Sequence, residues 1–219
     1  MVVKVKICGM CHGENIRDVA ALHPDYIGFI FYPKSKRYVN PAATPESLAI
    51  GKSIKKVGVF VNEEIGKMVD TVNQCALDMI QLHGDETPDQ CESIRHALPS
   101  ETCIIKAVSV KSEDDVLRCR QYDDVCDYIL TDTYTPAYGG SGMSFDHAWL
   151  KHYDSKLPLF VSGGIGLDEI DMLLQLARSI PIHAIDMNSR LEISPGLKDT
   201  ALVKSVFHKI RNAHGIFCK

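Results

Sequence analysis

The amino-acid sequence predicts an α/β fold in which eight strand–helix units close into a (β/α)8 barrel of the TIM type, in a single domain spanning residues 1–219. Two observations predict this fold. Short β-branched runs alternate with amphipathic or capped segments, and successive runs are spaced near-regularly, by about 25 residues. Such alternation implies parallel strands joined by right-handed crossovers. An open doubly wound sheet is the alternative arrangement of the same units.

The predicted strands are apolar and rich in β-branched residues, as buried parallel strands are. In chain order they are Val3–Ile7, Tyr26–Phe31, Lys56–Val61, Met79–Leu82, Cys103–Val108, Tyr128–Thr131, Leu159–Val161 and Ala184–Met187. Several of the segments between them open with Asp, Ser, Thr or Pro, which favour helix N-termini. The predicted helices are Glu14–Leu22, Pro45–Ile54, Glu63–Cys75, Pro88–Leu98, Glu113–Gln121, Phe145–His152, Leu167–Ala177 and Lys198–Ala213. No linker or low-complexity run divides the chain, so one domain is expected.

Composition excludes several classes of protein. The chain has 28 Asp and Glu against 24 Lys and Arg, a net charge of -4, and 45% hydrophobic residues, which argues against disorder. The sequence has no block of Lys and Arg, so nucleic acid is not an expected partner. The longest apolar stretches, such as Ile27–Tyr32, are far shorter than the roughly 18 residues that span a bilayer. We therefore expect a cytoplasmic protein that does not bind membranes.

The eight cysteines include one motif with competing interpretations. Cys8-Gly-Met-Cys11-His12 fits both the C-x-x-C redox pattern and the C-x-x-C-H haem-attachment pattern. A structural zinc site needs a second ligand pair at similar spacing, and the sequence has none. We expect reduced thiols, no metal and no cofactor, with a redox or metal-binding protein kept as a remote alternative.

Alternation along the strands places polar residues inside the barrel. In Val3–Cys8 the aliphatic side chains take one face and Lys4, Lys6 and Cys8 take the other. The same parity puts Gln81 and His83 on one face of their strand. It likewise separates Asp186 from its apolar neighbours. Polar groups should converge at the carboxyl ends of the strands, where barrel active sites lie.

Two glycine-containing or polar loops follow the last two strands. Gly163 and Gly164 come after the seventh strand, and Asn188, Ser189 and Arg190 come after the eighth. Phosphate commonly binds a barrel between these loops, on backbone N–H groups that glycine exposes. The sequence therefore predicts a phosphorylated small molecule as ligand, although Arg190 by itself also fits a solvated surface arginine.

Cys8 ends the first strand and Asp132 ends the sixth, so a barrel would place them on opposite sides of one mouth. A thiolate base and a carboxylic acid could then act on one substrate, and a nearby Lys6 ammonium would favour the thiolate. Taken singly, Cys8 also fits a small buried hydrophobe and Asp132 a loop cap.

Two further loops lie at the predicted mouth. Arg37 follows the second strand, where its planar guanidinium suits a carboxylate, although a surface cation is an equal alternative. The connection from Thr133 to Gly142 is long and contains Gly140 and Ser141, so it fits either a lid over the ligand or a surface turn.

Segments across nearly the whole chain resemble the phosphoribosylanthranilate isomerase family of tryptophan biosynthesis. They are Lys6–Gly9, Gly28–Pro33, Ser35–Tyr38, Val57–Asn62, Ile80–Asp85, Asp132, Gly139–Gly142, Phe145–Asp146, Ser162–Ile165 and Pro195–Asp199. The resemblance implies a metal-free barrel that converts N-(5-phosphoribosyl)anthranilate to 1-(2-carboxyphenylamino)-1-deoxyribulose 5-phosphate by an Amadori rearrangement.

The resemblance also implies roles for the site residues. Cys8 would be the general base, Asp132 the general acid, and Arg37 the partner of the anthranilate carboxylate. The expected substrate contacts are Arg37, His83, Gly140, Ser141 and Asp186, and the expected phosphate contacts are Gly163, Gly164, Asn188, Ser189 and Arg190. The family usually has Ser-Gly or glycine-rich sequence at residues 188–190, so side chains are expected to share the phosphate here. A monomer or homodimer is expected, and the alternatives are another phosphosugar isomerase or epimerase and a catalytically silent phosphosugar-binding barrel.

Overall fold

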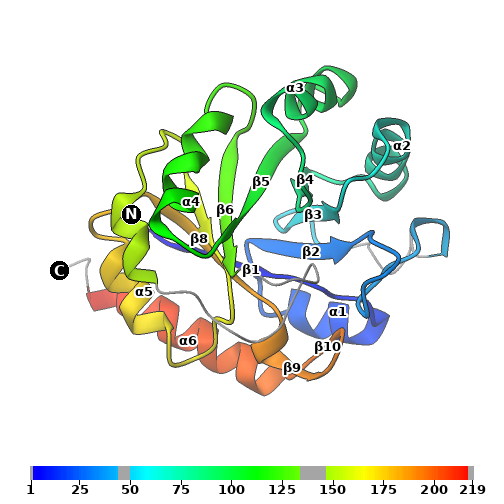
Figure 1. Ribbon diagram of the computed structural model, residues 1–219. Helices are drawn as coiled ribbons and strands as arrows, with labels where there is room; N and C mark the ends of the chain where they lie inside the picture. The colour runs from blue at the N-terminus through cyan, green and yellow to red at the C-terminus, as the bar shows by residue number, and fades with distance from the viewer. Residues whose placement is uncertain (1, 44–49, 134–146, 217–219) are drawn as a thin grey trace.

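A computed structural model describes residues 2–43, 50–133 and 147–216. Its eight parallel strands close into a barrel in chain order, with the helices outside it (Figure 1). The barrel strands are β1 (Lys4–Ile7), β2 (Tyr26–Ile30), β3 (Lys55–Phe60), β4 (Met79–Leu82), β5 (Cys103–Val110), β6 (Tyr128–Thr133), β7 (Leu159–Val161) and β8 (Ile182–Met187). The α-helices are α1 (Gly13–Ala20), α2 (Ile65–Cys75), α3 (Pro88–Ala97), α4 (Glu113–Leu117), α5 (Ile170–Leu176) and α6 (Thr200–Ile216). The predicted (β/α)8 fold is confirmed, and the open sheet is excluded because β8 pairs with β1.

The barrel wall separates two apolar layers. Val3, Val5 and Ile7 of β1 belong to the large cluster between strands and helices. A smaller cluster fills the lower interior of the barrel, and it consists of Tyr26, Val57, Met79, Ile105, Ala107, Leu130, Phe160 and Ala184. Above it, at the carboxyl ends of the strands, the interior becomes polar with Lys6, Gln81 and Asp186, each at most 5% exposed. The predicted inward parity of these residues is therefore confirmed.

The amino-terminal end of the barrel interior is closed by aromatic rings. Tyr26, Tyr128 and His183 surround Phe160, with ring centroids 5.2 to 5.4 Å from it. The Tyr26 hydroxyl lies 2.7 Å from His183 Nε2. Burial, with a smaller contribution from Lys4, lowers the pKa of His183 to about 4. This end of the barrel thus holds a neutral histidine in a packed layer, away from the mouth.

Three of the predicted helices differ from the structure. The described part of the predicted helix Pro45–Ile54 is not helical: it turns at Gly51, whose carbonyl accepts from Ile54 N at 3.0 Å, just before β3. Glycine is a poor helix former and ends such a pattern. The predicted helix Glu113–Gln121 is α-helical only in α4 and continues as a 3-10 helix over Arg118–Tyr122.

The third difference is the predicted helix Phe145–His152, whose described residues form a 3-10 helix over His147–His152. Short connecting turns of this kind are where 3-10 helices are commonly found. The helix predicted over Leu167–Ala177 begins later, at Ile170, and the last helix begins at Thr200. Asp199 marks that start, because its carboxylate accepts from two backbone N–H groups of the first turn.

A small hairpin between β8 and α6 was not predicted. Its strands are β9 (Glu192–Ser194) and β10 (Leu197–Lys198), which pair antiparallel across Pro195-Gly196. Gly196 has φ +86, a conformation that favours glycine, and a Cβ there would lie 2.1 Å from Cys11 Sγ. The hairpin directs Glu192 and Lys198 toward the mouth, which proves important for the site.

The cysteines and the helices bear on two further expectations. The seven cysteines among the described residues are all free thiols. In the same part of the chain, no helix combines the length and the apolar character required to cross a bilayer.

Candidate active site

A cavity of about 390 Å³ opens at the carboxyl ends of the strands. Ten of the twelve predicted site residues line it: Cys8, Arg37, His83, Asp132, Gly163, Gly164, Asp186, Asn188, Ser189 and Arg190. The other two, Gly140 and Ser141, lie outside the described residues. The fold therefore gathers residues from six separate strand ends and loops around one space.

Cys8 follows β1 and is held tightly in place. Its backbone N–H donates to Met187 O at 2.9 Å, and a Cβ on Gly28 would lie 2.6 Å from its sulfur, so only glycine leaves room for the thiol. Burial raises the pKa of Cys8, and the Lys6 ammonium opposes that effect without overcoming it. The expectation that Lys6 favours the thiolate holds in direction, but desolvation is the larger effect in the ligand-free site.

Asp132 projects from the end of β6 on the cavity wall. Its Oδ1 accepts from Thr133 N at 2.8 Å, and its Oδ2 lies 3.3 Å from His83 Nε2. A Cβ on Gly163, which has φ +100, would lie 2.4 Å from Thr133 Oγ1 and 3.4 Å from Asp132 Oδ1. The glycine after β7 thus permits the close approach that brings this loop next to the carboxylate.

Lys6 and Asp186 form a buried ion pair between β1 and β8. The Lys6 ammonium donates to Asp186 Oδ2 at 2.9 Å and to Gln81 Oε1 at 2.7 Å. Burial lowers the pKa of Lys6, but Asp186 and Cys8 outweigh it, so the net pKa is raised and the cation persists. Asp186 Oδ1 is buried and has no hydrogen-bond partner among the described residues. Because Asp186 lines the cavity, this unpaired oxygen could accept a hydrogen bond from a ligand hydroxyl.

Arg37 is already paired in the ligand-free chain. Its Nε and Nη2 donate to the two carboxylate oxygens of Glu192 at 2.8 and 2.7 Å, which is a bidentate pair. Burial alone would raise the pKa of Glu192, but Arg37 and Lys198 outweigh it and hold the pKa below its ordinary range. A guanidinium carries five N–H donors, so this pair leaves three for another acceptor at the cavity wall.

The expected phosphate loops meet across the mouth. Gly163 and Gly164 both have positive φ, +100 and +64, and both line the cavity, Gly163 buried and Gly164 half-buried. Asn188 Oδ1 accepts from Lys198 Nζ at 2.7 Å, so its amide is fixed by that lysine. Arg190 is 46% exposed and lies 3.4 Å from Glu169. Exposure leaves Arg190 able to turn toward an anion.

Sequence reasoning gave no role to Gln81, Glu192 or Lys198. Gln81 was placed inside the barrel by parity, and Lys198 lies in one of the resembling segments, but nothing indicated their partners. Lys198 has no exposed side-chain surface and connects Glu192 at 2.7 Å with the Asn188 loop. Apart from its place in that segment, the sequence carries no signal for this role, because the burial of Lys198 appears only in the folded chain.

The two cysteines of the C-x-x-C motif pack in different places. Cys8 lies against Gly28 at the mouth, whereas Cys11 lies against Gly196 of the hairpin. Within residues 2–43, 50–133 and 147–216, no group of three His, Cys, Asp or Glu side chains is arranged to hold a metal ion.

Comparisons with known proteins agree with the geometry. The family model for N-(5'phosphoribosyl)anthranilate (PRA) isomerase matches residues 5–209. The N-(5'-phosphoribosyl)anthranilate isomerase of Parabacteroides distasonis is 39% identical over 208 residues, covering 94% of this chain and 92% of its own. That of Thermotoga maritima is 37% identical over 216 residues, covering 98% and 100%.

Solved structures show the same likeness. A crystal structure of phosphoribosyl anthranilate isomerase from Thermotoga maritima superposes with a TM-score of 0.85 at 35% identity, covering 96% of this chain and 99% of that one. Another structure of the enzyme, in complex with reduced 1-(o-carboxyphenylamino)-1-deoxyribulose 5-phosphate, has a TM-score of 0.78 at 31% identity, with coverage of 96% and 99%. This chain therefore belongs to the N-(5'-phosphoribosyl)anthranilate isomerase family.

Proposed function

We propose that Cys8 and Asp132 catalyse, as base and acid, the Amadori rearrangement of N-(5-phosphoribosyl)anthranilate to 1-(2-carboxyphenylamino)-1-deoxyribulose 5-phosphate. As a member of the family, the protein is an isomerase of tryptophan biosynthesis. The observation that carries the two assignments is the placement of a thiol and a carboxylate at the ends of β1 and β6, both lining one cavity. No other thiol among the described residues lines it.

The reaction needs one proton given and one taken. Asp132, protonated, donates to the furanose ring oxygen as the C1′–O bond breaks, and the anthranilate nitrogen supplies the electron pair that forms a C1′=N iminium. The Cys8 thiolate then removes the C2′ proton, and the C2′–H electrons neutralise the iminium to give an enolamine, which tautomerises to the ketone. The anthranilate nitrogen and the C2′–H bond supply the electron pairs, and the two side chains supply and take the protons, so the steps balance without an added oxidant or reductant.

Substrate contacts follow from the donors and acceptors at the wall. Arg37 would use its remaining N–H donors for the anthranilate carboxylate, and Asp186 Oδ1 would accept from a sugar hydroxyl. The phosphate would lie between the Gly163-Gly164 backbone and the loop of residues 188–190, with Arg190 adding charge. His83, Gly140 and Ser141 remain proposed substrate contacts.

The proposal extends to the domain organisation, the cellular location and the oligomeric state of the protein. Residues 1–219 would form one domain that works in the cytoplasm, without metal or cofactor, as a monomer or homodimer. A related enzyme from Thermotoga maritima has been described as dimeric. Sedimentation velocity at several concentrations would separate the two oligomeric states.

The activity is tested by following the loss of phosphoribosylanthranilate fluorescence with purified, metal-stripped protein. We expect turnover, and we expect Asp132→Asn to lower kcat by on the order of a hundredfold or more, because an amide has no proton of comparable acidity to give. Asp154→Asn, the same chemical change at a residue that follows the 3-10 helix His147–His152, pairs with Arg120 and does not line the cavity, serves as the control. Normal turnover in Asp132→Asn would remove that residue from the mechanism.

A further inference from the structure

A continuous chain of polar side chains crosses the barrel from β1 to β6. Lys6 Nζ lies 2.7 Å from Gln81 Oε1, and Gln81 Nε2 lies 2.7 Å from His83 Nδ1. His83 Nε2 in turn lies 3.3 Å from Asp132 Oδ2. This series of contacts therefore connects Lys6, which lies near the proposed base Cys8, with the proposed acid Asp132. Gln81, in the middle of the series, has no assigned role.

The chemistry of these groups fixes the direction of every donor. An ammonium only donates, so Lys6 requires the oxygen of the Gln81 amide to face it. The amide NH₂ must then face His83 Nδ1, and Nδ1 can accept only if it carries no proton. The ring proton is consequently on Nε2, where it points toward Asp132.

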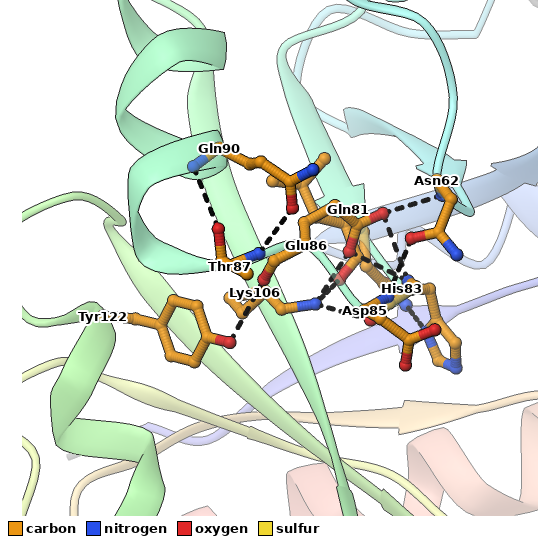
Figure 2. Close-up of polar contacts among 11 residues, drawn as sticks. Asn62, Gln81, His83, Asp85, Glu86, Thr87, Gln90, Lys106 and Tyr122 are labelled. Atoms are coloured by element: carbon orange, nitrogen blue, oxygen red, sulfur yellow. Dashed lines mark hydrogen bonds and ion pairs between the residues drawn. The ribbon is translucent and has the colours of Figure 1, made fainter.

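The surroundings hold this arrangement in place. Lys6 is fully buried and Gln81 is 1% exposed, so a flipped amide would place its NH₂ against the ammonium at hydrogen-bond distance, two donors facing each other. The backbone N–H of His83 donates to Phe60 O at 2.8 Å. Figure 2 shows Gln81 reaching His83, and shows Glu86 binding the loop that follows β4.

That loop is fixed by a buried carboxylate. Glu86 accepts from Asn62 N at 2.9 Å, from Gly84 N at 3.0 Å and from Lys106 Nζ at 2.8 Å. Lys106 also donates to Gly84 O at 2.8 Å. Gly84, the residue after His83, is thus bound at both its N–H and its C=O, which limits how far the imidazole can move.

We propose that Gln81 is a positioning residue that holds His83 in the Nε2–H tautomer, so that His83 presents a donor to Asp132. The catalytic purpose rests on the proposed role of Asp132 as general acid. When Asp132 gives up its proton, the His83 Nε2–H and the Thr133 N–H face the two oxygens of the carboxylate that forms. Donors placed in advance for a developing charge stabilise the carboxylate as it forms, and so lower the activation barrier of the proton transfer.

Gln81→Glu tests the proposal because it keeps the side-chain shape and replaces the NH₂ donor by a carboxylate oxygen, while adding one negative charge beside Lys6. The new carboxylate can still accept from Lys6, but it can only accept from His83, so Nδ1 must take the proton. Side-chain ¹⁵N NMR, with the His83 signals identified by their loss in His83→Asn, reads the tautomer directly. Gln74→Glu, on the exposed face of α2, is the matched control.

In the wild type we expect Nε2 protonated and Nδ1 unprotonated, and in Gln81→Glu we expect Nδ1 protonated. We expect kcat of Gln81→Glu to fall by about ten- to a hundredfold, less than the roughly hundredfold or more expected for loss of the general acid itself, with KM changed by less than about threefold. Gln74→Glu should match the wild type in both measurements. A wild-type His83 protonated on Nδ1 would overturn the proposal, and this measurement needs no variant at residue 81 to fold.

Asp132→Asn, measured in parallel, separates two kinds of failure. Full activity in Asp132→Asn overturns the acid role and with it the purpose of the positioning. Loss of activity there, together with unchanged kcat in a Gln81→Glu protein whose tautomer has inverted, overturns the role of Gln81 alone.

Discussion

Arg37 and Glu192 form a bidentate ion pair at the cavity wall, although 155 residues separate them in the chain. Glu192 is also bound by Lys198 at 2.7 Å, and Lys198 holds the Asn188 loop. The guanidinium is therefore oriented before any ligand arrives, and the loop that is proposed to hold phosphate is tied to the same carboxylate. Preorganisation of this kind reduces the entropy that binding must overcome.

We expect Arg37→Ala to raise KM for phosphoribosylanthranilate by about ten- to a hundredfold while kcat falls much less, because the lost contact is made in both ground and transition states. Arg37→Lys should recover only part of the binding, since an ammonium cannot pair with Glu192 and a planar carboxylate in the same way. Steady-state kinetics on both variants provides the measurement. Arg17→Ala, at an exposed position on α1, is the control, and an unchanged KM in Arg37→Ala would place the substrate carboxylate elsewhere.

The interior of the barrel could be predicted from sequence because strand side chains alternate with a period of two. Lys6, Gln81 and Asp186 each interrupt an apolar strand, and that parity placed them inside correctly. The pairing of Arg37 with Glu192 could not be predicted, because it depends on a hairpin whose only local signal is the Pro195-Gly196 turn.

The helices were predicted less well than the strands. Periodicity indicates that a segment covers the barrel, but it does not distinguish an α-helix from a 3-10 helix. The 3-10 helix Arg118–Tyr122 shows this, since it directly follows α4 within one predicted helix. Periodicity also could not predict the pKa of Cys8. Burial raises that pKa more than Lys6 lowers it, and the extent of burial depends on how the folded chain packs around the sulfur.

Replacement of the proposed base should abolish most of the activity. We expect Cys8→Ser to lower kcat by on the order of a hundredfold or more, since a hydroxyl is a far weaker acid than a thiol and supplies almost no anionic base near neutral pH. Cys11→Ala is the matched control from the same motif, and it should retain most of its activity because Cys11 packs against the hairpin. Near-normal turnover in Cys8→Ser, or loss of activity in Cys11→Ala, would contradict the assignment.

The raised pKa of Cys8 makes its reactivity dependent on pH in a definite direction. Only the thiolate is alkylated, and an ordinary cysteine ionises near pH 8.5, so burial should move the midpoint for Cys8 to higher pH. We expect the rate of iodoacetamide labelling at Cys8, followed by peptide mass spectrometry, to keep rising above about pH 9 in the ligand-free protein. For the same reason kcat/KM should rise with pH on its acid side. A labelling midpoint below that of free cysteine would show that Lys6 outweighs desolvation.

His183 at the closed end of the barrel should make the protein less stable in mild acid. Its pKa is lowered to about 4 in the folded chain, whereas an unfolded histidine titrates near 6.5, so between these values the unfolded chain binds a proton that the folded chain does not. The free energy of unfolding should therefore fall as pH drops from about 6.5 toward 4. Because the ring is only partly buried, we expect this group to contribute about 1 to 2 kcal/mol.

Urea unfolding at pH 7.5 and pH 5 measures the effect of His183 against a control. In His183→Gln, where the amide can still pair with the Tyr26 hydroxyl, the difference in unfolding free energy between the two pH values should be smaller than in the wild type. His96→Gln, on the exposed face of α3, should leave that difference unchanged. An equal pH dependence in the wild type and His183→Gln would mean that the ring accepts its proton in place, and that the aromatic layer around Phe160 accommodates a cation without loss of packing.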